Sequence, residues 1–103
     1  MYIGFDMDIQ YLHRGTTFCW NLSKAISNWH KHGVNFEAAV AVFDDPLLVV
    51  QDASRNGQPR EAVIGFDTHT RLLFVVYVEI RDDGLRIISA RRATRREEAI
   101  YAQ

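Results

Sequence analysis

The stretch LRIISARRATRREEAIY, residues 85–101, decides the fold. Its first half is apolar and β-branched, and its second half places Thr94 and Glu97 as a capping box, so it predicts a strand that leads directly into a helix over 95–102. Five arginines and no acidic residue lie between residues 84 and 96, although the chain has a net charge of −1. Such a local block of positive charge indicates an anionic partner or, equally, a solvated charged face.

A run of strands precedes this stretch. The Asn56-Gly57 pair marks a tight hairpin turn, and the segment around LLFVVYV is apolar on both faces, which is typical of a central strand. Every connection is too short for a crossover helix, so the pattern predicts a four-stranded antiparallel meander. Its strands are predicted over 47–51, 60–66, 71–80 and 85–91, with turns at 53–59, 67–70 and 82–84.

Two short helices are predicted ahead of the meander. The first runs from an N-cap at Asn21 to Gly33, and the second begins after an N-cap at Asn35. The second ends at Asp44-Asp45-Pro46, which we interpret as a helix terminator in preference to a catalytic pair of carboxylates. A buried apolar stripe on the first helix is predicted from the spacing of Leu22, Ala25, Ile26 and Trp29.

The chain begins with β-branched and aromatic segments at 8–11 and 16–20, which predict a hairpin. Residues 1–15 are expected to form an N-terminal extension or an edge strand, and both Met1 and Met7 are compatible with a start. The fold class is therefore α+β in one domain over residues 1–103. We expect an N-terminal hairpin or strand, two short helices, the four-stranded antiparallel meander and a C-terminal helix.

Composition narrows the class of protein. Of the 103 residues, 48% are apolar and 24% charged, which is typical of a globular domain and not of a disordered or fibrous chain. The single cysteine, Cys19, has no partner for an internal disulfide. No apolar run approaches the ~20 residues of a membrane span. We therefore expect a soluble, cytoplasmic protein with no membrane partner.

Several chemistries lack their usual motifs. The histidines show no metal-ligand spacing, so no metal and no cofactor is predicted. A Gly-rich phosphate loop, a nucleophile elbow and a local Cys-His pair are all missing, which argues against NTPases, hydrolases and thiol enzymes. His30 and His32 flank Lys31 at a helix C-terminus, where cations are favoured by the helix dipole. The alternative to such a capping or exposed role is that Lys31 or His32 acts as a catalytic base or binds a phosphate.

The arginines of the last strand divide between two faces. Simple alternation places Arg86 and Arg92 on one face, ~20 Å apart, and Arg91 on the other. The planar guanidinium suits phosphate oxygens, so Arg86 and Arg92 are predicted to follow several phosphates of one RNA strand. Arg91 is expected either to hold a partner protein or to pair with a structural carboxylate.

Three blocks in this order carry a resemblance: KHGV at 31–34, VFDDP at 42–46 and RIISARRAT at 86–94. With Trp20 and Tyr101, they make residues 18–101 resemble the BrnT family, the toxin component of a bacterial type II toxin–antitoxin pair. The resemblance implies a RelE-like fold and ribonuclease activity. It also implies neutralisation by a BrnA-like antitoxin that represses the operon, so that DNA is contacted only indirectly, through the antitoxin. A homodimer is a further possible assembly.

The resemblance also suggests a site. The substrate would be RNA, cleaved without a metal ion by attack of its own 2′-hydroxyl. The residues predicted to catalyse this are Lys31, His32, Arg60, Arg86, Arg91 and Arg92. The residues predicted to bind the RNA elsewhere are Arg71, Arg81, Arg95, Arg96 and Tyr101.

The chain departs from the family pattern at two places. Asn21 follows Trp20 where relatives typically have aspartate, and Gln58-Pro59 precedes Arg60 where an acidic pair is frequent. Two alternatives to an active ribonuclease therefore stay open. One is a catalytically weakened homologue that serves as a protein-binding module for its antitoxin. The other is an RNA-binding domain without cleavage, for which Tyr77 and Tyr101 are the only candidates for base stacking.

Overall fold

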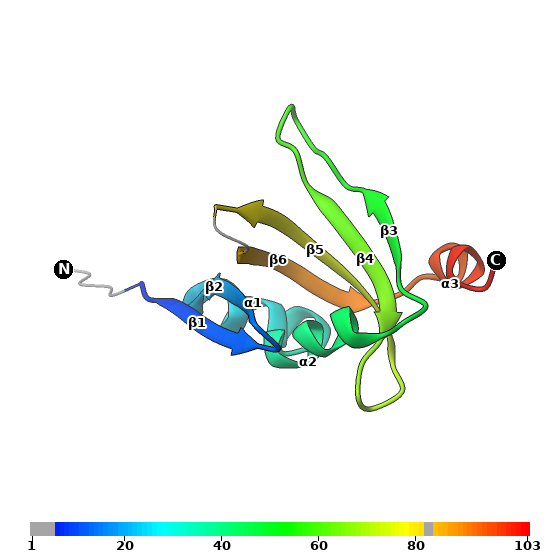
Figure 1. Ribbon diagram of the computed structural model, residues 1–103, viewed down its shortest axis with the longest axis horizontal. Coiled ribbons are helices and arrows are strands. Elements are labelled where there is room, and N and C mark those ends of the chain that lie inside the picture. The colour runs from blue at the N-terminus through cyan, green and yellow to red at the C-terminus, as the bar shows by residue number, and fades with distance from the viewer. Residues whose placement is uncertain (1–5, 82–83) are drawn as a thin grey trace.

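A computed structural model describes residues 6–81 and 84–103 and confirms the mixed α+β class (Figure 1). Residues 1–5 of the predicted extension and residues 82–83 of the last predicted turn lie outside the described part. In chain order the elements are β1 (Asp8–His13), β2 (Thr16–Asn21), α1 (Leu22–His32), α2 (Phe36–Ala41), the 3₁₀ helix η1 (Val42–Asp44), β3 (Val49–Asp52), β4 (Glu61–Phe66), β5 (Leu72–Ile80), β6 (Gly84–Arg92) and α3 (Arg95–Tyr101).

The sheet corrects the prediction of a four-stranded meander. It has six strands in the order β1-β2-β6-β5-β4-β3, because the N-terminal hairpin adds its second strand to β6. That pairing is parallel and short, and it joins Thr17, Phe18 and Cys19 to Gly84, Leu85 and Arg86. Pairing of this kind gives β1 the edge position that was expected of the N-terminal segment.

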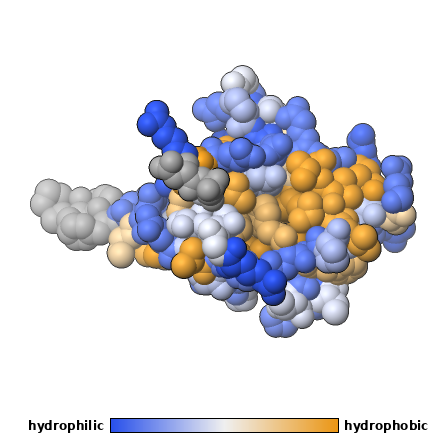
Figure 2. All heavy atoms as spheres, viewed as in Figure 1, coloured by the Kyte–Doolittle hydropathy of each residue, from blue (hydrophilic) through white to orange (hydrophobic). Residues whose placement is uncertain are grey.

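One face of the sheet is covered by α1 and α2, and the hydrophobic core lies between these helices and the sheet. Phe18, Trp20, Phe36, Val75 and Ile87 are among its buried members. We call the other side of the sheet the open face, because among the helices of the described residues only α3 packs against it. Figure 2 shows apolar side chains gathered toward β3, β4 and α3 in this view.

The inner side of α1 differs from the predicted apolar stripe. Ile26 and Trp29 are 51% and 53% exposed, whereas Ala25 is half-buried and Asn28 is buried. The reason is that Asn28 takes the central inner position and bonds to the backbone of β6 at Ala90. The helix is therefore oriented by a polar contact rather than by its largest apolar side chains.

Local turn chemistry follows the predictions. Asn56 and Gly57 both have positive φ angles, 52° and 77°, between the bridged residues Arg55 and Gln58, as a two-residue hairpin turn requires. The capping box at the start of α3 is present in full. None of the helices in the described part of the chain is long and apolar enough to cross a membrane.

A β-bulge in β6 changes which residues share a face. Val76 lies opposite Ser89 and Tyr77 lies opposite Ile87, so Ile88 is an extra residue without a partner on β5. Side chains alternate strictly only on either side of such an extra residue. The alternation of β6 is therefore shifted by one position after Ile88.

This shift overturns the predicted division of the arginines. Arg91 lies opposite Phe74 on the open face, the same face as Arg86. Arg92 lies opposite the buried Leu73, on the face that carries α1 and α2. The pair that shares a face is thus Arg86 and Arg91, and the prediction of Arg86 with Arg92 is wrong.

Candidate RNA-binding groove

Three adjoining depressions follow the edge of β6 that faces α1 and continue onto the open face. The first, of about 480 Å³, shares Lys24 and Ile88 with the second, of about 260 Å³. The second shares Ser89 with the third, of about 400 Å³. We call the three together the basic groove. In order along it, the cationic residues and the shared serine are Arg86, Lys24, Lys31, His32, Ser89, Arg91, Arg60 and Arg55.

The groove exists because β2 leaves β6 early. Their ladder ends at Arg86, and the chain then continues as α1 beside the remaining half of β6. Asn28 fixes this helix against the strand: its Nδ2 donates to the carbonyl oxygens of Val34 (2.9 Å) and Ala90 (2.8 Å), and its Oδ1 accepts from the Ala90 amide (3.0 Å). The edge of β6 near Ile88 and Ser89 is left as the floor of the middle depression.

The middle depression has the least compensated charge. Lys24, Lys31 and His32 are all exposed, and within the described residues no carboxylate pairs with any of them. His32 is the last residue of α1, and the left-handed Gly33 (φ 66°) ends the helix directly after it. An anion in this part of the groove therefore meets cations whose charge no carboxylate compensates.

Arg91 is already engaged by a carboxylate. Its Nη1 and Nη2 donate to the two oxygens of Glu97 at 2.8 and 2.9 Å, and Nη1 also donates to the Arg92 carbonyl. The guanidinium carbon stands 4.3 Å from the centre of the Phe74 ring. Arg91 holds the pKa of the Glu97 carboxyl below its usual range. The expectation of a structural carboxylate for Arg91 is thereby confirmed.

Arg86 is paired in a similar way at the other end. Its Nη2 lies 2.8 Å from the Asp8 carboxylate of β1, and this bond lowers the pKa of Asp8. Both partners are accessible to water, so the pair contributes little to stability. It does reduce the charge that Arg86 offers to a ligand.

The two departures from the family pattern keep local hydrogen bonds. Asn21 caps α1, because its Oδ1 accepts from the Lys24 amide at 2.9 Å, while its Nδ2 donates to Asp6 at 2.6 Å. Gln58 accepts from Nη2 of Arg60 at 3.2 Å. The amide side chains of Asn21 and Gln58 thus cap α1 and contact Arg60 at the two positions of departure.

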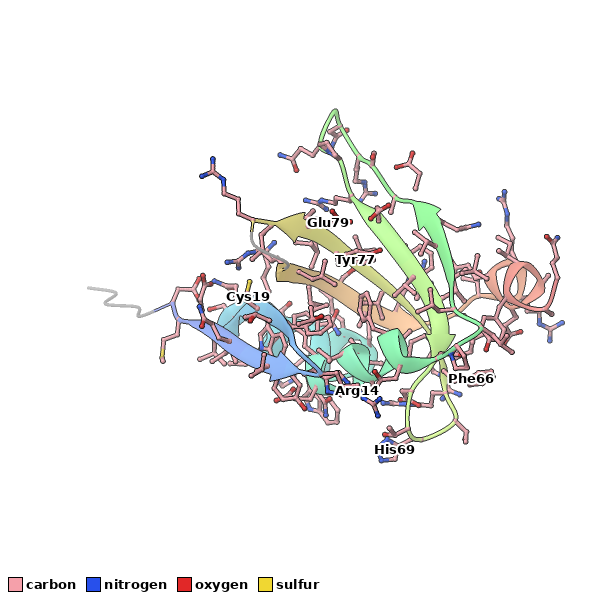
Figure 3. The ribbon with its side chains drawn as sticks, in the orientation of Figure 1. Arg14, Cys19, Phe66, His69, Tyr77 and Glu79 are labelled. Carbon is pink, nitrogen blue, oxygen red and sulfur yellow. The ribbon has the colours of Figure 1, made fainter. Side chains whose placement is uncertain are left out.

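The remaining predicted site residues lie outside the groove. Arg71 donates to Asp67 and to the Gly33 carbonyl, which ties the β4–β5 turn to the end of α1. Tyr77 is buried in the core rather than available for stacking, and burial raises its pKa to about 12 (Figure 3). The other predicted site residues that do not line the groove are all exposed or half-buried: Arg81, Arg92, Arg95, Arg96 and Tyr101.

The 3₁₀ helix η1 ends at Asp44, as predicted for a helix terminator, and Asp45 has a further structural role. Its Oδ2 accepts from the Tyr101 hydroxyl (2.7 Å) and the Phe66 amide (2.9 Å), and its Oδ1 accepts from the Leu47 amide (2.9 Å). The bond to Asp45 raises the pKa of Tyr101 to about 12. The ring of Tyr101 also packs edge-on against Phe66, so α3 is anchored to β4.

Sequence reasoning missed Lys24, Arg55 and Ser89. Lys24 and Lys31 are seven residues apart on one helix, and this two-turn spacing places both on one side, so a signal was present. Arg55 lies in the β3–β4 hairpin and meets the groove only through the sheet. In the described residues no group of three or more His, Cys, Asp and Glu side chains is arranged to hold a metal ion.

A family model described as the ribonuclease toxin BrnT of a type II toxin–antitoxin system matches residues 20–97. The chain belongs to the BrnT family. The crystal structure of the Brucella abortus ribonuclease toxin BrnT has the same fold, with a TM-score of 0.55, 20% sequence identity, and coverage of 74% of this chain and 94% of that one. No curated protein matches the chain. Family membership makes a ribonuclease toxin the established class, and it implies an antitoxin as partner.

Acid is expected to loosen α3. The pKa of Glu97 is lowered in the folded state, so the stability from its bond to Arg91 is complete above the ordinary value of 4.5 and is lost as pH falls through the lowered value. Amide hydrogen exchange of α3 between pH 7 and pH 3 measures this. In Glu97→Gln we expect weaker protection at neutral pH and a smaller acid response, because the contribution of Glu97 is gone while Asp45, whose pKa is also lowered, still contributes. Equal exchange in both proteins would contradict the prediction.

Proposed function

We propose that this BrnT-family protein is an endoribonuclease that cleaves RNA in the basic groove without a metal ion. The observation that carries the proposal is that five of the six residues predicted to be catalytic, from distant parts of the chain, border one continuous groove. These residues are Lys31, His32, Arg60, Arg86 and Arg91. RNA cleavage would inhibit translation, and an antitoxin of the BrnA type would neutralise the activity and contact the operator DNA.

The scissile phosphate fits best beside Ser89, where the middle depression meets the third. On one side stand Lys31 and His32, and on the other Arg60 and Arg91. A histidine can accept and donate a proton near neutral pH, which suits the two proton transfers of the reaction. We assign Lys31 and His32 to those transfers and the arginines to the negative charge that develops at phosphorus.

The steps balance without a cofactor. His32 takes the proton of the 2′-hydroxyl, and the 2′-oxygen forms a bond to phosphorus. The bond from phosphorus to the 5′-oxygen breaks, and that oxygen receives a proton from Lys31. The products are a 2′,3′-cyclic phosphate and a free 5′-hydroxyl, as expected for attack by the substrate's own hydroxyl.

Arg91 is able to serve both its carboxylate and a phosphate. A guanidinium has five N–H groups. Three of them are used toward Glu97 and the Arg92 carbonyl. Nε–H and one Nη2–H thus have no partner within the described residues. The contact with Glu97 fixes the orientation of these two donors.

The experiment is cleavage of an RNA oligonucleotide by the purified protein in EDTA. We expect cleavage to persist, to yield 2′,3′-cyclic phosphate ends, and to stop when the nucleotide at the cleaved bond carries a 2′-O-methyl group. Loss of activity on chelation, or cleavage that continues past the 2′-O-methyl group, would overturn the mechanism.

A second function has specific support. Asp8 and Glu97 compensate Arg86 and Arg91, two of the charges that a catalytic site would use. A catalytically weakened homologue whose main task is to bind the antitoxin would tolerate this. Expression of the folded protein without growth arrest, together with tight antitoxin binding, would favour that function.

A further inference from the structure

We propose that the basic groove takes a single strand of RNA across the edge of β6, with Lys24 and Arg55 holding the phosphates on either side of the one that is cleaved. This inference rests on the proposed function and adds the form of the substrate and two residues that bind it. Neither residue belongs to the predicted site.

The continuity of the groove is the first argument. Lys24 borders both the first and the second depression, and Ser89 borders both the second and the third. With about 480, 260 and 400 Å³, the three depressions offer successive places for neighbouring nucleotides. Lys24 comes from α1 and Arg55 from the β3–β4 hairpin, so the cleaved phosphate beside Ser89 lies between cations of two separate elements.

Charge is the second argument. Within the described residues, neither Lys24 nor Arg55 pairs with a carboxylate. Both are exposed, whereas Arg86 and Arg91 are held by Asp8 and Glu97. Lys24 and Arg55 therefore offer a full charge to a phosphate, while the two paired arginines offer a reduced one.

The third depression combines charge with an apolar floor. Phe74 and Val76 of β5 form part of its lining together with Arg55 and Arg60. Such a surface suits one nucleotide, whose phosphate contacts guanidinium groups while its base or ribose covers apolar side chains. The third depression is thus a subsite for a nucleotide that flanks the cleaved bond.

The path of the groove favours a single strand over a duplex. Its middle depression lies between α1 and the edge of β6, and its third depression lies on the open face, so the path bends where the two meet at Ser89. A single strand can bend over this edge and present its bases to the floor. A double helix is stiff and exposes its bases only in its grooves, so it would touch one end of the path alone.

The test measures binding separately from cleavage. Fluorescein-labelled oligouridylates of two and eight nucleotides, 2′-O-methylated throughout, are titrated with the full-length protein at several salt concentrations. Each phosphate contact contributes roughly 0.7 to the slope of log affinity against log salt for a single strand. We expect Lys24→Ala and Arg55→Ala each to lower the slope for the eight-nucleotide ligand by about 0.7 and to narrow its advantage over the two-nucleotide ligand.

The control is Arg14→Gln. Arg14 is exposed, lies in the β1–β2 turn and borders none of the three depressions, and the substitution also removes one positive charge (Figure 3). We expect its slope to match that of the parent protein. Slopes that stay unchanged in both groove variants, or equal affinity for a duplex of eight base pairs, would overturn the inference.

The two proposals fail in different ways. Length-dependent binding that needs Lys24 and Arg55, without cleavage of the unmodified octamer, would sink the proposed ribonuclease function and leave the RNA path supported. Cleavage of the octamer with unchanged salt slopes in both variants would leave the enzyme in place and refute the path.

Discussion

Replacement of Asn28 by alanine is expected to reduce the free energy of unfolding by about 3–5 kcal/mol. The amide of Asn28 is buried and makes three hydrogen bonds, to the Val34 carbonyl and to both backbone groups of Ala90. Alanine satisfies none of them. Each buried group left without a partner costs about 1–3 kcal/mol, and the missing side chain leaves a void in addition.

Chemical denaturation measures this effect, and two further variants separate its causes. Ser27→Ala changes an exposed neighbour on the same helix and should stay within about 0.5 kcal/mol of the parent. Asn28→Asp keeps the acceptor for the Ala90 amide but places a second oxygen against two carbonyl oxygens, so it should be destabilised as well. A value for Asn28→Ala close to that of Ser27→Ala would refute the role given to this side chain.

Substitution of His32 or Lys31 by alanine is expected to reduce kcat for RNA cleavage by about a hundredfold each. Both residues border the depression beside Ser89, and both are expected to move a proton of the reaction. The position of His32 is set from two sides. Gly33 ends α1 directly behind it, and Arg71 donates to the Gly33 carbonyl at 3.1 Å.

Single-turnover kinetics with a labelled RNA measure the effect. His30→Ala is the matched control, since His30 is exposed on the same helical turn but does not line the groove. The pH–rate profile of His32→Ala should also lose one limb, which a purely structural loss would not cause. A rate for His32→Ala equal to that of His30→Ala would remove His32 from the mechanism.

Much of the local structure could be predicted, because its signals are short-range. The capping box of Thr94 and Glu97 and the Asn56-Gly57 turn depend on residues within a few positions, and both are present as expected. The central position of β5 followed from its apolar character on both faces. These features need no knowledge of the rest of the chain.

What could not be predicted depends on distant contacts. The pairing of Thr17 with Gly84 joins two segments that are separated by most of the chain, and no local sequence pattern predicts it. The buried Asn28 reads as a polar surface residue until β6 lies beside it. The groove itself results from these two features. Some residues of the groove were therefore predicted from the resemblance to the BrnT family, but their arrangement in space was not.

The bulge at Ile88 divides β6 into two parts whose side-chain alternation differs by one position. Arg86 and Arg91 are five positions apart, an odd spacing that would ordinarily separate them, yet they share a face. The number of residues between two arginines thus matters as much as their identity. In a relative whose two arginines are four or six positions apart and whose strand has no bulge, both arginines would still lie on the open face. A relative with the same spacing and no bulge would turn one of them toward the helices.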